Sequence, residues 1–191
     1  RMKPITTLLT ILFISLLSSP SWSDTLTMDD LTERNGFYYK KFTNVPFSGL
    51  VVQDCPKGKP KDIFQEGFSG KIVNGLREDY WIITSCFTSS IQRGNFLRGQ
   101  RDGTWEFYNK DGQLEKIGPF RNNKPHGDWT WYDKWGRLII KDKYEDGELV
   151  FWTSYDENEQ VEKMGPYKNG EPVGTWKFFK NGQLDKTIEY K

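Results

Sequence analysis

Apolar and polar residues alternate in short runs along most of this chain. Trp105-Glu106-Phe107-Tyr108 reads apolar, charged, apolar, aromatic, and a period of two predicts a half-buried β-strand. Asn109-Lys110-Asp111-Gly112 then predicts a turn, because Asp-Gly between two strand-like runs is a strong hairpin signal. Leu114 to Ile117 is expected to form the returning strand. A helical turn is expected only over Met28 to Arg34.

The same phrase recurs along the chain. Trp105, Trp129, Trp152 and Trp176 are separated by 24, 23 and 24 residues, and Trp81 lies one further period upstream. A period in the twenties is typical of stacked supersecondary units that bury a continuous core between neighbours. The sequence therefore predicts an all-β, single-domain array of stacked antiparallel hairpins.

Two rows of aromatic residues follow from this repeat. We expect the tryptophans to form the structural core of the array: Trp81, Trp105, Trp129, Trp152 and Trp176. The third residue after each of the last four is also aromatic, and strand alternation places it on the other face. We interpret this second row as the candidate partner-binding surface: Tyr108, Tyr132, Tyr155 and Phe179.

The chain divides into three segments. Residues 1–23 combine Arg1 and Lys3 with a short apolar run and small residues up to Ser23, which is typical of a secretory signal peptide. An N-terminal membrane anchor is the alternative. We expect residues 24–67 to form an atypical N-terminal cap and residues 68–191 to form the repeats. The mature protein is then periplasmic or secreted.

Charge and cysteine content narrow the function. Removing residues 1–23 removes two of 27 basic residues and none of 26 acidic ones, which leaves a net charge of −1. That balance argues against nucleic-acid binding, which needs a basic surplus. Cys55 and Cys86 are the only cysteines, so an exported protein is expected to join them in a disulfide, with two separate thiols as the alternative.

The repeat motif resembles the variant MORN-repeat proteins of bacteria. The matching phrase is an aromatic, Gly, Gly-x-Trp, a second aromatic and a turn Gly with Leu two residues on, and residues 94–191 carry it best. The resemblance implies a curved ribbon of hairpins, and many such proteins are labelled YwqK-type antitoxins. Asp142 stands where the other units have a junction glycine, and Glu159 replaces a turn glycine, although Asn158 could adopt the left-handed conformation there. Local specialisation and ordinary repeat decay are both readings of this unit.

No catalytic constellation is visible. His126 is the only histidine and lies in a turn, where we expect a solvated loop residue. One histidine and two cysteines cannot complete a zinc site of four ligands. We therefore expect no enzyme activity, no catalytic residues, no metal and no cofactor.

The leading hypothesis is an exported, non-enzymatic β-repeat scaffold that binds another protein in the envelope or outside the cell. One alternative is a module that binds a glycan or a lipid headgroup at a membrane. A second alternative is a periplasmic immunity or antitoxin-like protein. Open sheet edges would also suit oligomer formation by strand addition.

Overall fold

The computed structural model describes residues 25–55 and 66–191. The expected signal peptide, residues 1–23, lies outside the described residues, as do residues 56–65 of the N-terminal cap. No helix within the two described ranges is long and apolar enough to cross a membrane.

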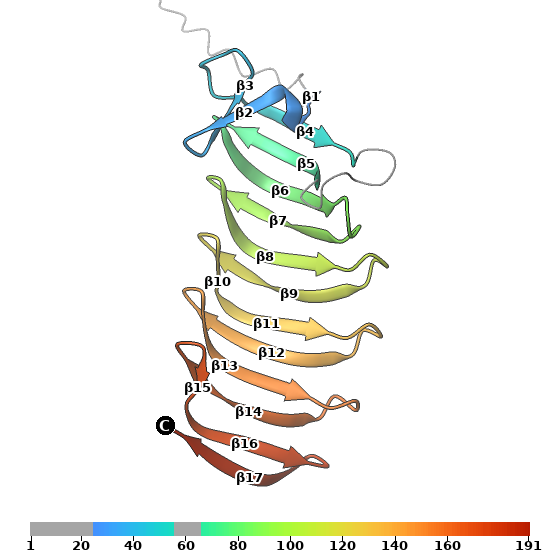
Figure 1. Ribbon diagram of the computed structural model, residues 1–191, viewed down its shortest axis with the longest axis vertical. Coiled ribbons are helices and arrows are strands. Elements are labelled where there is room, and N and C mark those ends of the chain that lie inside the picture. Colours follow the sequence, from blue (N-terminus) through green and yellow to red (C-terminus); the bar gives the residue numbers. More distant parts are fainter. Residues whose placement is uncertain (1–24, 56–65) are drawn as a thin grey trace, which may run out of the picture.

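The described chain forms one long sheet of consecutive hairpins (Figure 1). Its strands are β1 (Thr25–Leu26), β4 (Gly49–Gln53), β5 (Glu66–Val73), β6 (Leu76–Ser85), β7 (Ile91–Leu97), β8 (Gln100–Tyr108), β9 (Leu114–Arg121), β10 (Lys124–Pro125), β11 (Gly127–Tyr132), β12 (Leu138–Glu145), β13 (Glu148–Tyr155), β14 (Val161–Lys168), β15 (Glu171–Pro172), β16 (Gly174–Lys180) and β17 (Gln183–Tyr190). From β4 to β17 every pairing is antiparallel, which confirms the predicted all-β array of hairpins.

The N-terminal segment departs from the expected pattern. The helical turn predicted over Met28 to Arg34 is confined to the 3-10 helix η1 (Met28–Asp30), and β2 (Leu31–Arg34) follows directly. β2 is a strand because it pairs with β3 (Phe37–Lys40) across Asn35 and Gly36, whose positive φ angles give a tight hairpin. β1 pairs with β4 in parallel, unlike the rest of the sheet.

The turn after β13 also differs from the expectation. The sequence offered Asn158 as a residue that could take the left-handed conformation, but Glu159 takes it, with φ of +57°. The backbone there is held by Asp156, whose carboxylate accepts hydrogen bonds from the N–H groups of Asn158 and Gln160. Glu159 also accepts a hydrogen bond from Leu138 N at 2.9 Å, which links this turn to the preceding hairpin.

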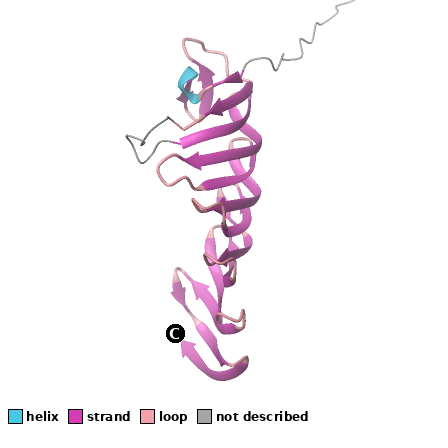
Figure 2. Cartoon of the chain, turned by 90° about the vertical axis from the view of Figure 1, so that its right-hand side faces the viewer, coloured by secondary structure: helices cyan, strands magenta, loops and turns pink. Residues whose placement is uncertain are grey.

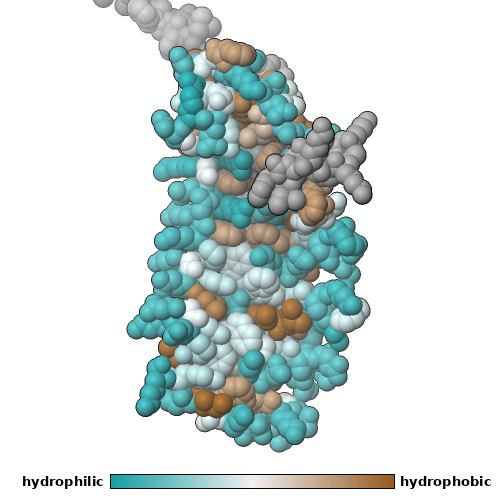
Figure 3. All heavy atoms as spheres, in the orientation of Figure 1, coloured by the Kyte–Doolittle hydropathy of each residue, from teal (hydrophilic) through white to brown (hydrophobic). Residues whose placement is uncertain are grey.

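The strands are bowed, as the edge-on view in Figure 2 shows. A column of apolar and aromatic residues runs along the sheet between hydrophilic margins (Figure 3). The buried apolar residues are Leu31, Phe47, Val51, Ile72, Trp81, Ile83, Phe96, Trp105, Trp129 and Trp176. The core is therefore a thin layer of rings over one sheet.

The expected disulfide is present. Cys55 follows β4 and Cys86 follows β6, and their Cα atoms are 5.3 Å apart. The bond closes a loop of 31 residues in sequence between the N-terminal cap and the first repeat.

Candidate binding faces

The sheet has two faces with different chemistry. We call the side that carries Trp81, Trp105, Trp129 and Trp176 the tryptophan face, and the other side the opposite face. The four tryptophans are between 0% and 4% exposed. Alternation along the strands assigns their neighbours to one face or the other.

A glycine lies beneath each of these four rings. A Cβ atom on that glycine would come within 2.1 to 2.5 Å of the indole carbons of the tryptophan 11 residues later. We call these residues seat glycines: Gly70, Gly94, Gly118 and Gly165. Each indole N–H then donates to the backbone carbonyl of the residue after its seat glycine, at 3.0 to 3.1 Å. The seat glycine therefore lets the ring lie flat on the sheet with its polar atom paired.

Aromatic residues two positions after the seat glycines join the tryptophans into a ladder. Phe96 packs edge-on between Trp81 and Trp105, with ring centroids 5.8 and 5.2 Å away. Phe120 does the same between Trp105 and Trp129, at 6.1 and 5.1 Å. Edge-to-face geometry is favourable for such rings and adds to the energy of burial.

Lysines lie over aromatic rings on this same face. Lys116 Nζ is 4.7 Å from the Phe107 ring centroid and 4.5 Å from that of Trp131. Burial lowers the pKa of Lys116; Glu115 opposes this shift and Arg101 adds to it. Lys116 also borders a hollow of about 220 Å³.

Two further lysines repeat this arrangement. Lys163 lies 5.1 Å from the Trp152 ring and Lys186 lies 5.4 Å from the Phe178 ring. Within the described residues, no carboxylate pairs with Lys116, Lys163 or Lys186. The sequence analysis did not identify this row. Aligning the repeats could have found Lys116 and Lys163, because both stand two residues before a seat glycine.

Two arginines extend the cationic row towards the N-terminus. The Arg77 guanidinium lies among aromatic rings, 4.9 Å from that of Trp81, and donates to Tyr38 Oη at 3.1 Å. The Arg101 guanidinium lies 4.5 Å from the Trp105 ring and donates to Gln92. Burial lowers the pKa of Arg101 and the charge of Arg77 lowers it further, against an opposing effect of Glu66. The guanidinium hydrogen bonds thus go to neutral oxygens.

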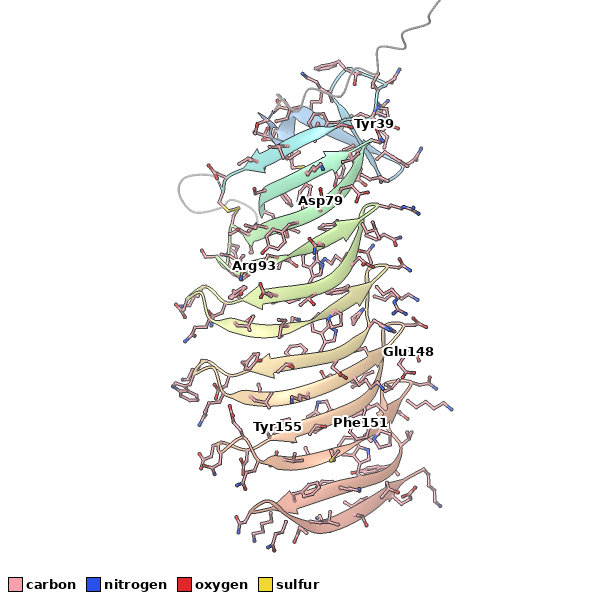
Figure 4. All side chains as sticks on the ribbon, turned by 180° about the vertical axis from the view of Figure 1, so that it is seen from behind. Tyr39, Asp79, Arg93, Glu148, Phe151 and Tyr155 are labelled. Carbon is pink, nitrogen blue, oxygen red and sulfur yellow. A yellow bond between two sulfur atoms is a disulfide. The ribbon has the colours of Figure 1, made fainter. Side chains whose placement is uncertain are left out.

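The candidate partner-binding aromatics have different surroundings. Each is half-buried and directly follows a register shift in its strand: Tyr108, Tyr132, Tyr155 and Phe179. Tyr108 accepts a hydrogen bond from Arg93 at 2.6 Å, and Arg93 also pairs with Glu106 on the opposite face. Tyr155 lies beneath Lys141, at 5.9 Å (Arg93 and Tyr155 are labelled in Figure 4). At least two of the four therefore belong to the opposite face.

The unit around Trp152 breaks the pattern. Asp142 occupies the place of the seat glycine and pairs with Trp152 across β12 and β13. Its side chain is only 6% exposed, and its Oδ2 accepts hydrogen bonds from Trp131 Nε1 at 2.8 Å and Tyr144 Oη at 3.4 Å. Its Oδ1 is buried with no hydrogen-bond partner among the described residues. Burial raises the pKa of Asp142 despite the two hydrogen bonds, which lower it.

His126 lies near the carboxylate of Asp146. Its Nδ1 is 4.0 Å from Asp146 Oδ1 and makes no hydrogen bond, and its side chain is only 29% exposed, so it is less solvated than expected. The described residues contain no cluster of three or more His, Cys, Asp or Glu that could hold a metal ion.

Comparison with known proteins agrees with this geometry. The family model described as MORN repeat variant matches residues 101–122 and 152–169. No curated protein sequence gives a significant match. The first matched segment spans most of the hairpin β8–β9, and the second begins at Trp152. Together with the repeated packing, these matches show that the chain carries MORN-variant repeats.

Proposed function

We propose that this protein is a non-catalytic β-repeat scaffold that binds an extended, acidic segment of another protein on its tryptophan face. The main observation behind this proposal is a row of cations over aromatic rings, Lys116, Lys163 and Lys186, for which no described carboxylate lies within ion-pair distance. Lys116 is half-buried and its ammonium is partly desolvated, so an incoming carboxylate would compensate that cost. Lys163 is also half-buried, and Lys186 adds an exposed positive charge on the same face.

The geometry of the row suits an extended ligand. Lys116 is on β9, Lys163 on β14 and Lys186 on β17, so the row crosses many strands. Because neighbouring strands are about 4.8 Å apart, these three lysines are spread along the sheet. A segment that contacts all of them would have to run across the strands rather than pair with one edge strand. Aromatic rings beside the cations offer contact area at a low entropic cost.

The proposed location is the cell envelope or the outside of the cell. It is supported by the signal-like pattern of residues 1–23 and by the Cys55–Cys86 bond, since disulfides persist in oxidising compartments. A crosslinked pull-down from the cell envelope with the oxidised protein would identify the partner.

Two double variants, each lacking two lysines, test which face of the sheet binds the acidic segment. Lys116→Ala with Lys186→Ala removes two cations from the tryptophan face, and Lys141→Ala with Lys177→Ala removes two from the opposite face. We expect a labelled poly-glutamate peptide, and the captured partner, to bind the second variant like wild type and to bind the first several-fold more weakly. Loss in the second variant alone would assign binding to the opposite face with Tyr108 and Tyr155. Retention of wild-type binding by both would contradict the proposal.

A further inference from the structure

Trp152 has no seat on the sheet. It pairs with Asp142 on one side and with Gly165 on the other. Gly165 is already covered by Trp176, whose indole would lie 2.4 Å from a Cβ there. The only remaining position is that of Asp142, where a side chain stands instead of a hydrogen atom.

The Trp152 ring is accordingly more open than the other four. It is partly exposed, and it lies 5.8 Å from Trp176 in a tilted arrangement, with Lys163 Nζ 5.1 Å from its centroid. Its indole N–H makes none of the backbone hydrogen bonds that pair the N–H groups of the other four tryptophans of the repeat. Trp152 therefore presents an aromatic ring, a free donor and an adjacent ammonium.

The unit around Trp152 is unusually polar for this sheet. The buried polar side chains of the described residues are Asp142, Thr153 and Ser154, and all three belong to this unit. A buried carboxyl with one unpaired oxygen costs stability, whereas the glycine of the other units does not. This unit is therefore packed less favourably than the others, and it leaves the Trp152 ring partly exposed.

We propose that Trp152 with Lys163 is the principal contact of the tryptophan face for the acidic segment, and that Asp142 is a positioning residue that keeps the indole off the sheet. This inference rests on the proposed function. Lys163 would pair with a carboxylate of the segment, and the indole N–H would donate to a second oxygen of the same group or of the backbone. Aromatic residues that pack against a partner and exclude water commonly dominate binding energy.

The substitution Asp142→Gly tests whether Asp142 positions the Trp152 ring for binding or only fills space. The substitution creates a seat in the register that Trp105 has with Gly94, so the Trp152 ring should settle on the sheet. We expect a higher urea midpoint and about tenfold weaker binding of the poly-glutamate peptide, as for loss of a central aromatic contact. A variant that becomes more stable and binds less is not expected if Asp142 only fills space.

Two companion variants complete the test. Asp142→Asn keeps the size of the side chain, so it should keep the ring displaced and bind like wild type. Trp152→Ala should bind about tenfold more weakly while losing little stability. Wild-type binding by Asp142→Gly or Trp152→Ala, or no gain in stability for Asp142→Gly, would overturn the inference. If those variants bind normally but Lys116→Ala with Lys186→Ala does not, only this inference fails; if none of them alters binding, the proposed function fails as well.

Discussion

The units around Trp105 and Trp152 share one strand register and differ in packing. Trp105 pairs with Gly94 and Gly118, and Trp152 pairs with Asp142 and Gly165. Trp105 is fully buried with its N–H paired, whereas Trp152 is partly exposed with its N–H unpaired by the backbone. The comparison teaches that the residue paired with the tryptophan on the preceding strand, rather than the tryptophan itself, decides whether a repeat contributes core or surface.

The two units should differ most in the stability that is lost when the tryptophan ring is removed. Trp105→Ala empties a fully buried site that also contacts Phe96 and Phe120, so we expect a loss of about 3 to 5 kcal/mol in the free energy of unfolding. Trp152→Ala should lose only about 1 kcal/mol, because the ring is partly exposed. Urea unfolding followed by far-ultraviolet circular dichroism measures both. Equal losses would show that Trp152 is core like the others.

Removing the disulfide tests whether the N-terminal end of the ribbon and the unit around Trp152 unfold independently. Replacing Cys55 and Cys86 by Ala opens a loop of 31 residues and should cost about 3 kcal/mol. Because repeats contact only their neighbours, the loss should be concentrated near β4 to β7. Hydrogen exchange resolved by segment should show faster exchange there and an unchanged rate at β12 to β14. Equally faster exchange in both regions would mean that the ribbon unfolds as one unit.

A methyl group at a seat glycine sharpens the comparison further. Gly118→Ala puts a Cβ 2.2 Å from the Trp129 ring and should cost about 2 kcal/mol through overpacking. Asp142→Ala is the matched control, since a Cβ is already accommodated there. It should change the free energy of unfolding by less than about 1 kcal/mol, because it removes a buried carboxyl but also the acceptor of the Trp131 and Tyr144 hydrogen bonds. Thermal unfolding of the two variants in parallel measures this difference in stability. A similar loss of stability in both variants would contradict the special packing of the seat glycine.

The fold was readable from the sequence because its determinants are local. The period of the tryptophans and the Asp-Gly and Asn-Gly turns predict stacked hairpins, and the structure has them. The exceptions come from turn interactions that apolar periodicity does not reveal. Leu31 to Arg34 is a strand because β3 pairs with it across the turn at Asn35 and Gly36, and Glu159 is left-handed because the Asp156 carboxylate holds the turn around it.

The candidate site was less readable. The substitution of Asp142 for glycine was visible in the sequence, but its consequence depends on which ring uses which glycine, and that is a property of the sheet register. The lysine row was missed because each member directly follows an acidic residue, so the sequence looks like an ordinary charged strand surface: Glu115-Lys116, Glu162-Lys163 and Asp185-Lys186. Only the structure shows that Lys116 lies over two rings.

The smallest expected effect is a dependence of stability on pH that arises at Asp142. Burial raises its pKa in the folded protein above the unfolded value of about 4, so the folded state favours the protonated carboxyl. Its contribution to stability is therefore fully present below about pH 4 and is lost as the pH rises through the folded pKa. Trp131 Nε1 and Tyr144 Oη donate hydrogen bonds to the carboxylate, and no cation of the described chain forms an ion pair with it. Burial and the nearby Asp142 carboxyl raise the pKa of Tyr144.

Asp142→Asn isolates that dependence, because the amide does not titrate while His126 and the other groups remain in both proteins. The difference in unfolding free energy, wild type minus variant, should fall as the pH rises from about 4 through the folded pKa of Asp142, and it should level off above that pKa. Urea midpoints measured across that range give this difference directly. A difference that stays constant with pH would mean that the carboxyl keeps its ordinary pKa. Trp152 would then be displaced by the size of the side chain alone, without a contribution from its charge.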